Sequence, residues 1–254
     1  MALDNQVVAE LTEFMERWIV RRIANYNRET GHMPFLGRIV RDPSLVSSYS
    51  ITHSLATAIG MGLYEQISKM IATPNFDEVE LKRHLPEEIS PARRNLITTI
   101  VGDLQSGNRT ANRNVEMDEV LAIPNDHTVR SVGQPKVYDL YLRKGKEEWF
   151  FDLKTVKLSL GGEPGHKQVL LEWIAREDRR INAMLAFPYN PYEPEPFETR
   201  FTMRGILGRN EYMVGEEFWD FLGGVGTYKQ LLEVFDKVGA DHWDELRELM
   251  TGRV

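Results

Sequence analysis

The segment KVYDLYLRKGKEEWFFDLKTVK, residues 136–157, decides the fold expected of this chain. It contains two runs rich in β-branched and aromatic residues, 137–142 and 149–156, and such runs favour β-strands. Between them, Lys144-Gly145-Lys146 is typical of a short turn. The segment therefore predicts a β-hairpin.

Charged residues interrupt the hydrophobic pattern of this hairpin. Side chains alternate between the two faces of a strand, so Asp152 and Lys154 share one face. A turn at 144–146 brings Asp139 of the first strand near Asp152 of the second. Charges at the end of a hydrophobic run are costly unless they are paired or used. Two carboxylates and one ammonium are therefore expected to meet at one point.

These residue types fit metal chemistry on phosphate esters. Two carboxylates bind a hard divalent cation, which attracts a phosphate oxygen and lowers the pKa of a bound water. A neighbouring lysine orients or deprotonates that water and offsets charge in the transition state. We therefore expect Asp139 and Asp152 to bind Mg²⁺, and Lys154 to act with them in catalysis.

A structural ion pair between Asp152 and Lys154 is the alternative, because an acid-x-Lys triplet alone is common by chance. Glu80-Leu81-Lys82 is a second such triplet. It lies in a polar stretch that looks helical, and we expect no function for it. The strand context and the upstream Asp139 favour the catalytic interpretation of the hairpin triplet.

Asp139, the following twelve-residue gap and Asp152-Leu153-Lys154 resemble the signature of the PD-(D/E)XK nuclease superfamily. The runs 151–157, 185–192 and 215–220 resemble type II restriction endonucleases of the TdeIII-like group, over roughly residues 50–235. The resemblance implies an α/β (α+β) fold with a restriction-endonuclease-like core, a mixed central β-sheet flanked by helices. It also implies Mg²⁺-dependent cleavage of DNA. The signature's proline, often missing in the superfamily, is replaced here by Tyr138.

Many nucleases of this superfamily add a glutamate from a helix ahead of the hairpin. Glu65, in Gly62-Leu63-Tyr64-Glu65-Gln66-Ile67, resembles that catalytic position, although a solvated glutamate on a helix face is an equal alternative. Glu116 is a second candidate.

Donors that suit base edges gather in the polar loop 106–114, since arginine favours guanine and asparagine favours adenine. Arg109, Asn112 and Arg113 are therefore expected to bind DNA, and a plain solvated loop is the alternative. Phosphate contacts are expected from residues that flank the proposed site, namely Arg130, Lys157 and Lys167.

Periodic patterns elsewhere predict helices over 3–23, 53–72, 91–104, 167–180, 215–238 and 242–250, and strands over 184–188 and 199–206. We expect a single nuclease domain over 1–254. Within it, 1–50 form an N-terminal helical extension, 51–210 the catalytic core and 211–254 C-terminal helices.

Composition narrows the chemistry further. The chain of 254 residues has no cysteine, which excludes thiolate catalysis and cysteine-based zinc sites. Its net charge is −7, but residues 130–180 carry eleven Lys/Arg against eight Asp/Glu, whereas 211–254 carry four against ten. The middle of the chain is therefore the part expected to face an anion.

Without a basic apolar leader or a membrane-spanning run, the protein is expected in the cytoplasm of a prokaryotic cell.

The expected function is thus that of a type II restriction endonuclease acting on double-stranded DNA at a short GC-rich palindrome. A homodimer would match the two-fold symmetry of such a site. A cognate DNA methyltransferase is expected in the same system, but not as a stable partner. Two alternatives stay open: a structure-specific nuclease of DNA repair or recombination, and a non-catalytic DNA-binding protein with a relic hairpin.

Overall fold

The structure, a computed structural model, describes residues 3–26, 33–86, 88–125, 137–155, 162–197 and 205–251. The chain forms two compact units, here called the helical unit (Met1–Ile71 and Gly223–Val254) and the sheet unit (Ala72–Leu222). These boundaries lie at 71/72 and 222/223, whereas the sequence patterns suggested 50 and 210. That the parts act as one nuclease domain stays a prediction.

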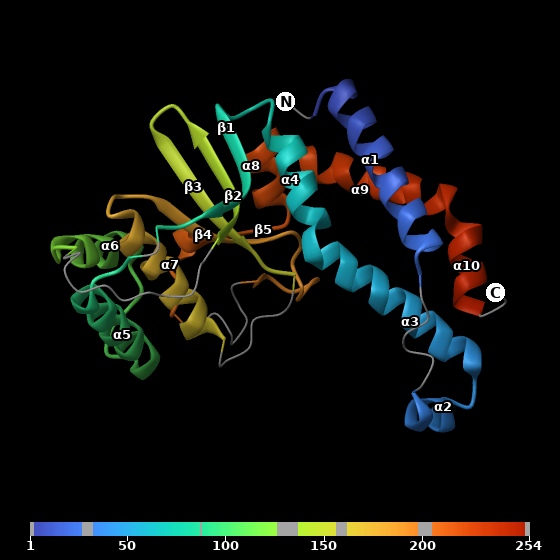
Figure 1. Ribbon diagram of the computed structural model, residues 1–254, viewed down its shortest axis with the longest axis horizontal. Helices are drawn as coiled ribbons and strands as arrows, with labels where there is room; N and C mark the ends of the chain where they lie inside the picture. Colours follow the sequence, from blue (N-terminus) through green and yellow to red (C-terminus); the bar gives the residue numbers. More distant parts are fainter. Residues whose placement is uncertain are drawn as a thin grey trace. The chain divides into compact units, whose positions relative to one another are not determined.

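A five-stranded sheet in the order β1-β2-β3-β4-β5 forms the centre of the sheet unit (Figure 1). Its strands are β1 (Glu78–His84), β2 (Val137–Lys144), β3 (Glu147–Leu153), β4 (Asn182–Phe187) and β5 (Tyr212–Val214). The pairs β1–β2 and β2–β3 are antiparallel, and the pairs β3–β4 and β4–β5 are parallel. The mixed sheet confirms the predicted fold class.

Helices cover both faces of this sheet (Figure 1). On one side lie α5 (Pro91–Ser106), α6 (Arg113–Ala122) and α7 (Glu163–Glu177), and on the other lies α8 (Glu216–Gly223). Successive side chains of β3 point to opposite faces of the sheet, as strand geometry requires. Phe150 packs against Tyr138, which also contacts Trp173 of α7, whereas Phe151 contacts Phe218 of α8.

The predicted hairpin is confirmed. β2 and β3 are joined by the two residues Gly145 and Lys146, and Gly145 has a positive φ of 61°. Glycine adopts such a left-handed conformation at little cost. The predicted strand 184–188 and the predicted helices 91–104 and 167–180 are also found, as β4, α5 and α7.

The prediction for residues 78–84 was wrong: the polar stretch containing Glu80-Leu81-Lys82 is the edge strand β1 and not a helix. Charged side chains protect an exposed sheet edge from pairing with other chains, so an edge strand lacks a strong hydrophobic pattern. β5, only three residues long, was not predicted either. Most of the predicted strand 199–206 lies outside the described residues.

The helical unit is built from both ends of the chain. It contains α1 (Asn5–Ala24), α2 (Pro34–Val40), α3 (Pro43–Ala58), the π-helical turn η1 (Ile59–Leu63), α4 (Tyr64–Ala72), α9 (Thr227–Asp241) and α10 (Trp243–Thr251). The helix predicted over 53–72 is kinked at Gly62, whose φ is 133°. The backbone N–H of Leu3 donates to Oε1 of Gln230, which ties the start of the unit to α9.

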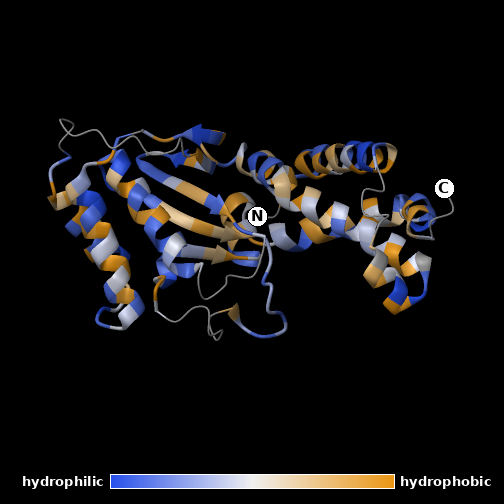
Figure 2. Cartoon of the chain, turned by 60° about the horizontal axis from the view of Figure 1, so that its bottom comes forward, coloured by the Kyte–Doolittle hydropathy of each residue, from blue (hydrophilic) through white to orange (hydrophobic). Residues whose placement is uncertain are grey.

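Hydrophobic and hydrophilic residues alternate along most helices (Figure 2). This pattern is typical of helices that bury one face. In α1 the buried face contains Val7, Leu11, Met15 and Ile19, at spacings of three to four residues. None of the helices in the described ranges is long and apolar enough to cross a bilayer.

Candidate active site

The two predicted aspartates lie side by side on neighbouring strands. In the β2–β3 register Leu140 is opposite Phe151, so the next step of the register sets Asp139 opposite Asp152. The backbone N–H of Leu153 donates to Oδ2 of Asp139 at 2.8 Å, which fixes one carboxylate oxygen against the partner strand.

Lys154 completes the predicted trio. Its Nζ lies 2.7 Å from Oδ1 of Asp152, and its backbone N–H donates to the carbonyl of Ala186 in β4 at 2.8 Å. The side chains of Asp139, Asp152 and Lys154 are between 15% and 24% exposed, so solvent and a ligand can reach them. The structure therefore brings together the three residues that the sequence selected.

The electrostatics of the trio are shaped by burial and by the second carboxylate. Burial raises the pKa of Asp152 to about 6, Lys154 opposes this rise, and the neighbouring Asp139 adds to it. His166, in the first turn of α7, is half-buried, and burial together with the charge of Lys154 lowers its pKa to about 4. His166 is therefore uncharged at neutral pH, and the charge of Lys154 is near enough to disfavour protonation of its imidazole.

A second lysine touches the site and was missed by sequence reasoning. Nζ of Lys82, in β1, lies 2.6 Å from Oδ1 of Asp139. The only sequence signal was the dismissed triplet Glu80-Leu81-Lys82, because Lys82 reaches Asp139 through sheet pairing across 57 positions of sequence. Each aspartate therefore has its own lysine.

The donor set fits a hard divalent cation. Asp139 and Asp152 offer carboxylate oxygens from adjacent strands, and Mg²⁺ typically uses one or two carboxylates, several waters and phosphate oxygens of the substrate. Within the described parts of the chain, no group of three or more carboxylate or imidazole side chains could hold a metal. Asp139 and Asp152 offer a two-carboxylate site, which waters and substrate oxygens would complete.

Comparison with known proteins shows the family of the chain. The HinfI type II restriction endonuclease family matches residues 3–239. The chain belongs to this family. The predicted placement among type II restriction endonucleases is confirmed, and the matching family is HinfI, whereas the sequence resemblance was drawn to the TdeIII-like group.

Curated relatives of this HinfI-family chain are type II restriction enzymes. It is 24% identical over 212 residues to MjaII of Methanocaldococcus jannaschii, covering 76% of this chain and 55% of MjaII. It is 25% identical to HgiBI of Herpetosiphon aurantiacus over 73% of this chain and 70% of HgiBI. For HgiCII of the same organism the identity is 25%, over 84% and 80%. No solved structure matches the chain.

The two further glutamate candidates differ in their surroundings. Glu65 lies in the first turn of α4, in the helical unit, so its role beside the aspartates of the sheet unit stays a prediction. Glu116 of α6 is fully buried: Oε1 accepts from the backbone N–H of Asn112 at 2.9 Å, and Oε2 pairs with Lys167. These contacts make Glu116 a structural residue and not a metal ligand.

Lys167 is not at the surface, although the sequence suggested a phosphate contact. Its fully buried ammonium pairs with Glu116 and lies 2.6 Å from Oε1 and 2.7 Å from Oε2 of Glu211. An ammonium enclosed by two carboxylates cannot reach a phosphate in this conformation. The phosphate prediction for Lys167 is therefore corrected to a role in holding α6, α7 and the turn η4 (Arg209–Glu211) together.

The predicted base-reading residues already have partners within the chain. Arg109 forms a bidentate ion pair with Glu119, in which both hydrogen bonds are 2.8 Å long. The side chain of Asn112 accepts from the backbone N–H of Val115 and so caps α6. Arg113 donates to Oδ1 of Asn182 and to the carbonyl of Asn210. DNA contacts by Arg109, Asn112 and Arg113 stay a prediction; Arg130 and Lys157 lie outside the described residues.

Asn112 and Arg113 line a cleft of about 740 Å³ together with Trp149, Asn182 and Arg209. Trp149 precedes Asp152 by three residues in β3, which corresponds to about 10 Å along the strand. Since Trp149 and Asn182 lie early in β3 and β4, this cleft is near the opposite end of these strands from the aspartates.

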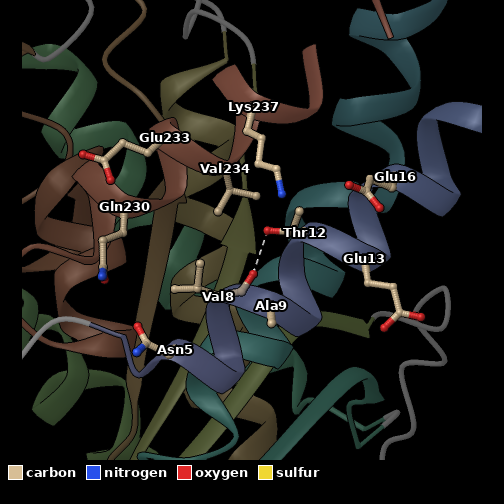
Figure 3. A pocket seen from close by; sticks show the side chains of 10 residues that line it. All are labelled: Asn5, Val8, Ala9, Thr12, Glu13, Glu16, Gln230, Glu233, Val234 and Lys237. Atoms are coloured by element: carbon tan, nitrogen blue, oxygen red, sulfur yellow. Dashed lines mark hydrogen bonds between the residues drawn. The ribbon is translucent and has the colours of Figure 1, made fainter. Parts of the chain in front are cut away.

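The helical unit has a hollow of about 520 Å³ between α1 and α9 (Figure 3). Glu13, Glu16 and Glu233 line it, and Lys237 is the one cationic residue among the described residues of its lining. Carboxylates repel phosphate groups, so this hollow is not a candidate nucleic-acid interface.

Glu163, in the first turn of α7, is a buried carboxyl that the sequence did not single out. Only 2% of it is exposed, and among the described residues its Oε1 has no hydrogen-bond partner. Burial raises its pKa to about 7 from an ordinary value of 4.5. The folded state thus binds this proton more tightly than the unfolded state, so stability should fall as pH rises from about 4.5 to about 7.

Glu163→Gln should therefore raise the free energy of unfolding at pH 8 by about 1 to 2 kcal/mol and change it little at pH 4.5. The amide keeps the shape and removes the buried charge. Urea unfolding at the two pH values measures the difference, with Glu13→Gln, at a side chain that is 67% exposed, as the control. A gain of equal size at both pH values would contradict the predicted cause.

Proposed function

We propose that this chain is a type II site-specific deoxyribonuclease that uses Mg²⁺ to hydrolyse phosphodiester bonds in double-stranded DNA. The observation that carries the proposal is the pairing of Asp139 with Asp152 across adjacent strands, with Lys154 at 2.7 Å from Asp152, in a chain of the HinfI family. The chain spans 55% of the length of MjaII, so the activity of that enzyme is proposed for this chain and is not taken over from the relative.

Each residue of the trio has a distinct task in this proposal. When bound, a divalent cation polarises a phosphate oxygen and lowers the pKa of a water. Asp139 and Asp152 supply the carboxylate oxygens that hold the cation. Lys154, whose Nζ lies 2.7 Å from Asp152, orients the attacking water and offsets the negative charge that develops on the phosphate.

The proposal extends to the partners. A homodimer would place one site on each strand of a duplex palindrome, and a short GC-rich palindrome is the proposed target. A methyltransferase of the same specificity would protect host DNA without staying bound, and the cytoplasm of a prokaryotic cell would be the setting. Light scattering of the purified protein, with and without duplex DNA, measures the oligomeric state.

Incubating the purified protein with a sequenced plasmid tests the proposed activity. Parallel reactions contain Mg²⁺, contain a chelator, or use the Asp152→Asn variant. Discrete fragments are expected only for the wild-type protein with Mg²⁺, and sequencing their ends gives the target site. Asparagine keeps the size of the side chain but removes the charge that holds the cation.

The outcomes separate the alternatives. Cleavage only of branched or damaged DNA would indicate a structure-specific nuclease instead. DNA binding without cleavage in any metal would support a non-catalytic DNA-binding protein. Fragments that persist in Asp152→Asn would mean that the hairpin is not the active site.

A further inference from the structure

Lys82, Asp139 and Asp152 form a row of alternating charge across three neighbouring strands. In the β1–β2 register Leu81 is opposite Leu140 and Arg83 is opposite Tyr138, so Lys82 falls opposite Asp139. Asp139 in turn falls opposite Asp152. The row places an ammonium from the edge strand directly on the proposed metal ligand, at 2.6 Å.

The backbone at Lys82 is in an unusual conformation. Its φ is +54°, in the left-handed region that residues other than glycine seldom adopt. Among the described non-glycine residues, Arg41 and Asp178 also have positive φ, but each ends a helix, where this conformation is common. Lys82 lies inside a strand. Strain of this kind collects at functional sites, which makes the position of its side chain significant.

The charges of Lys82, Lys154, Asp139 and Asp152 indicate a role for Lys82. Lys82 and Lys154 together balance Asp139 and Asp152, so the four groups carry no net charge when all are ionised. A divalent cation that binds the aspartates would meet two ammonium groups at the same oxygens. Repulsion would then favour movement of the half-exposed Lys82 side chain toward an incoming phosphate.

We propose that Lys82 is a positioning residue that holds Asp139 until DNA arrives and so couples binding of the metal to binding of DNA. The inference rests on the proposed function, because it takes Asp139 as a metal ligand and DNA as the substrate. Without DNA, Lys82 competes with the metal for Asp139. With DNA, the phosphate receives the ammonium and Asp139 becomes available to the metal. By linkage, the metal must then also strengthen DNA binding.

Mn²⁺ binding to the protein without DNA tests this directly, because free Mn²⁺ can be counted by electron paramagnetic resonance. Lys82→Gln should bind Mn²⁺ about fivefold more tightly than the wild-type protein, as expected for removal of one partly exposed ion pair. Lys82→Arg keeps the charge and should stay near the wild-type affinity. Lys146→Gln removes a lysine from the hairpin turn and should also leave the affinity unchanged.

The double variant Lys82→Gln, Asp139→Asn should bind Mn²⁺ no more tightly than Asp139→Asn alone, since Lys82 and the metal compete for Asp139. Unchanged Mn²⁺ affinity in Lys82→Gln, or a gain that survives in the double variant, would overturn the role of Lys82. The plasmid reaction distinguishes this failure from failure of the proposed function. If metal-dependent cleavage persists while the Mn²⁺ affinity does not respond to residue 82, only the coupling by Lys82 is wrong.

Discussion

Replacing Lys154 with methionine is expected to lower the maximal rate of DNA cleavage by about 1,000-fold while most of the DNA affinity is kept. Methionine has a similar length but no charge to orient water or offset charge on the phosphate. The variant also removes the ammonium that lowers the pKa of Asp152, so that this carboxyl is more often protonated. Single-turnover cleavage in Mg²⁺ and duplex binding in Ca²⁺ measure the two quantities separately.

The fold should tolerate this change. The bond that ties residue 154 to β4 is made by its backbone N–H and the carbonyl of Ala186, which does not depend on the side chain. Lys146→Met, in the exposed hairpin turn, is the matched control and should cleave at the wild-type rate. A Lys154→Met protein that keeps more than about a tenth of the rate would remove Lys154 from the catalytic group, since general acid–base effects are larger.

Replacing Lys167 with methionine is expected to lower the free energy of unfolding by about 3 to 5 kcal/mol at pH 8. The change leaves the carboxylates of Glu116 and Glu211 buried together without a cation. Burial already raises the pKa of Glu211, so this carboxyl should protonate as pH falls, and the loss should shrink toward pH 5. Such a loss is a large part of the 5 to 15 kcal/mol typical of a folded protein.

Urea unfolding at both pH values measures this loss, with Lys229→Met on the exposed side of α9 as the control. Adding Glu116→Gln and Glu211→Gln to Lys167→Met should recover part of the stability, because the buried negative charges are then gone. A loss below about 1 kcal/mol at pH 8 would instead show that solvent reaches the three groups, as it does for surface ion pairs.

The hairpin and its trio could be predicted because their signals are local. A two-residue turn and two hydrophobic runs fix which residues of β2 and β3 meet, and Asp139, Asp152 and Lys154 all lie within sixteen positions of sequence. Because side chains alternate between the faces of a strand, this pairing also fixes which of them share a face. The mixed sheet itself was inferred from family resemblance and not from these patterns.

Lys82 could not be found in the same way. Its strand lies at the sheet edge, where charge replaces the hydrophobic alternation that reveals a strand. Its pairing with Asp139 depends on long-range register, for which one sequence gives no signal. The loop residues Arg109, Asn112 and Arg113 show the reverse problem: their types suit DNA, but a helix cap, an ion pair and hydrogen bonds within the protein use the same side chains.

The split origin of the helical unit sets the order in which the protein can be built during translation. The sheet unit is one continuous stretch, whereas α1 packs with α9, and the bond from Leu3 to Gln230 spans 227 positions. At synthesis rates of about 5 to 20 residues per second, the first helix waits roughly 10 to 45 s for its partner. Throughout that time the stripe of Val7, Leu11, Met15 and Ile19 is open to chaperones or to neighbouring nascent chains.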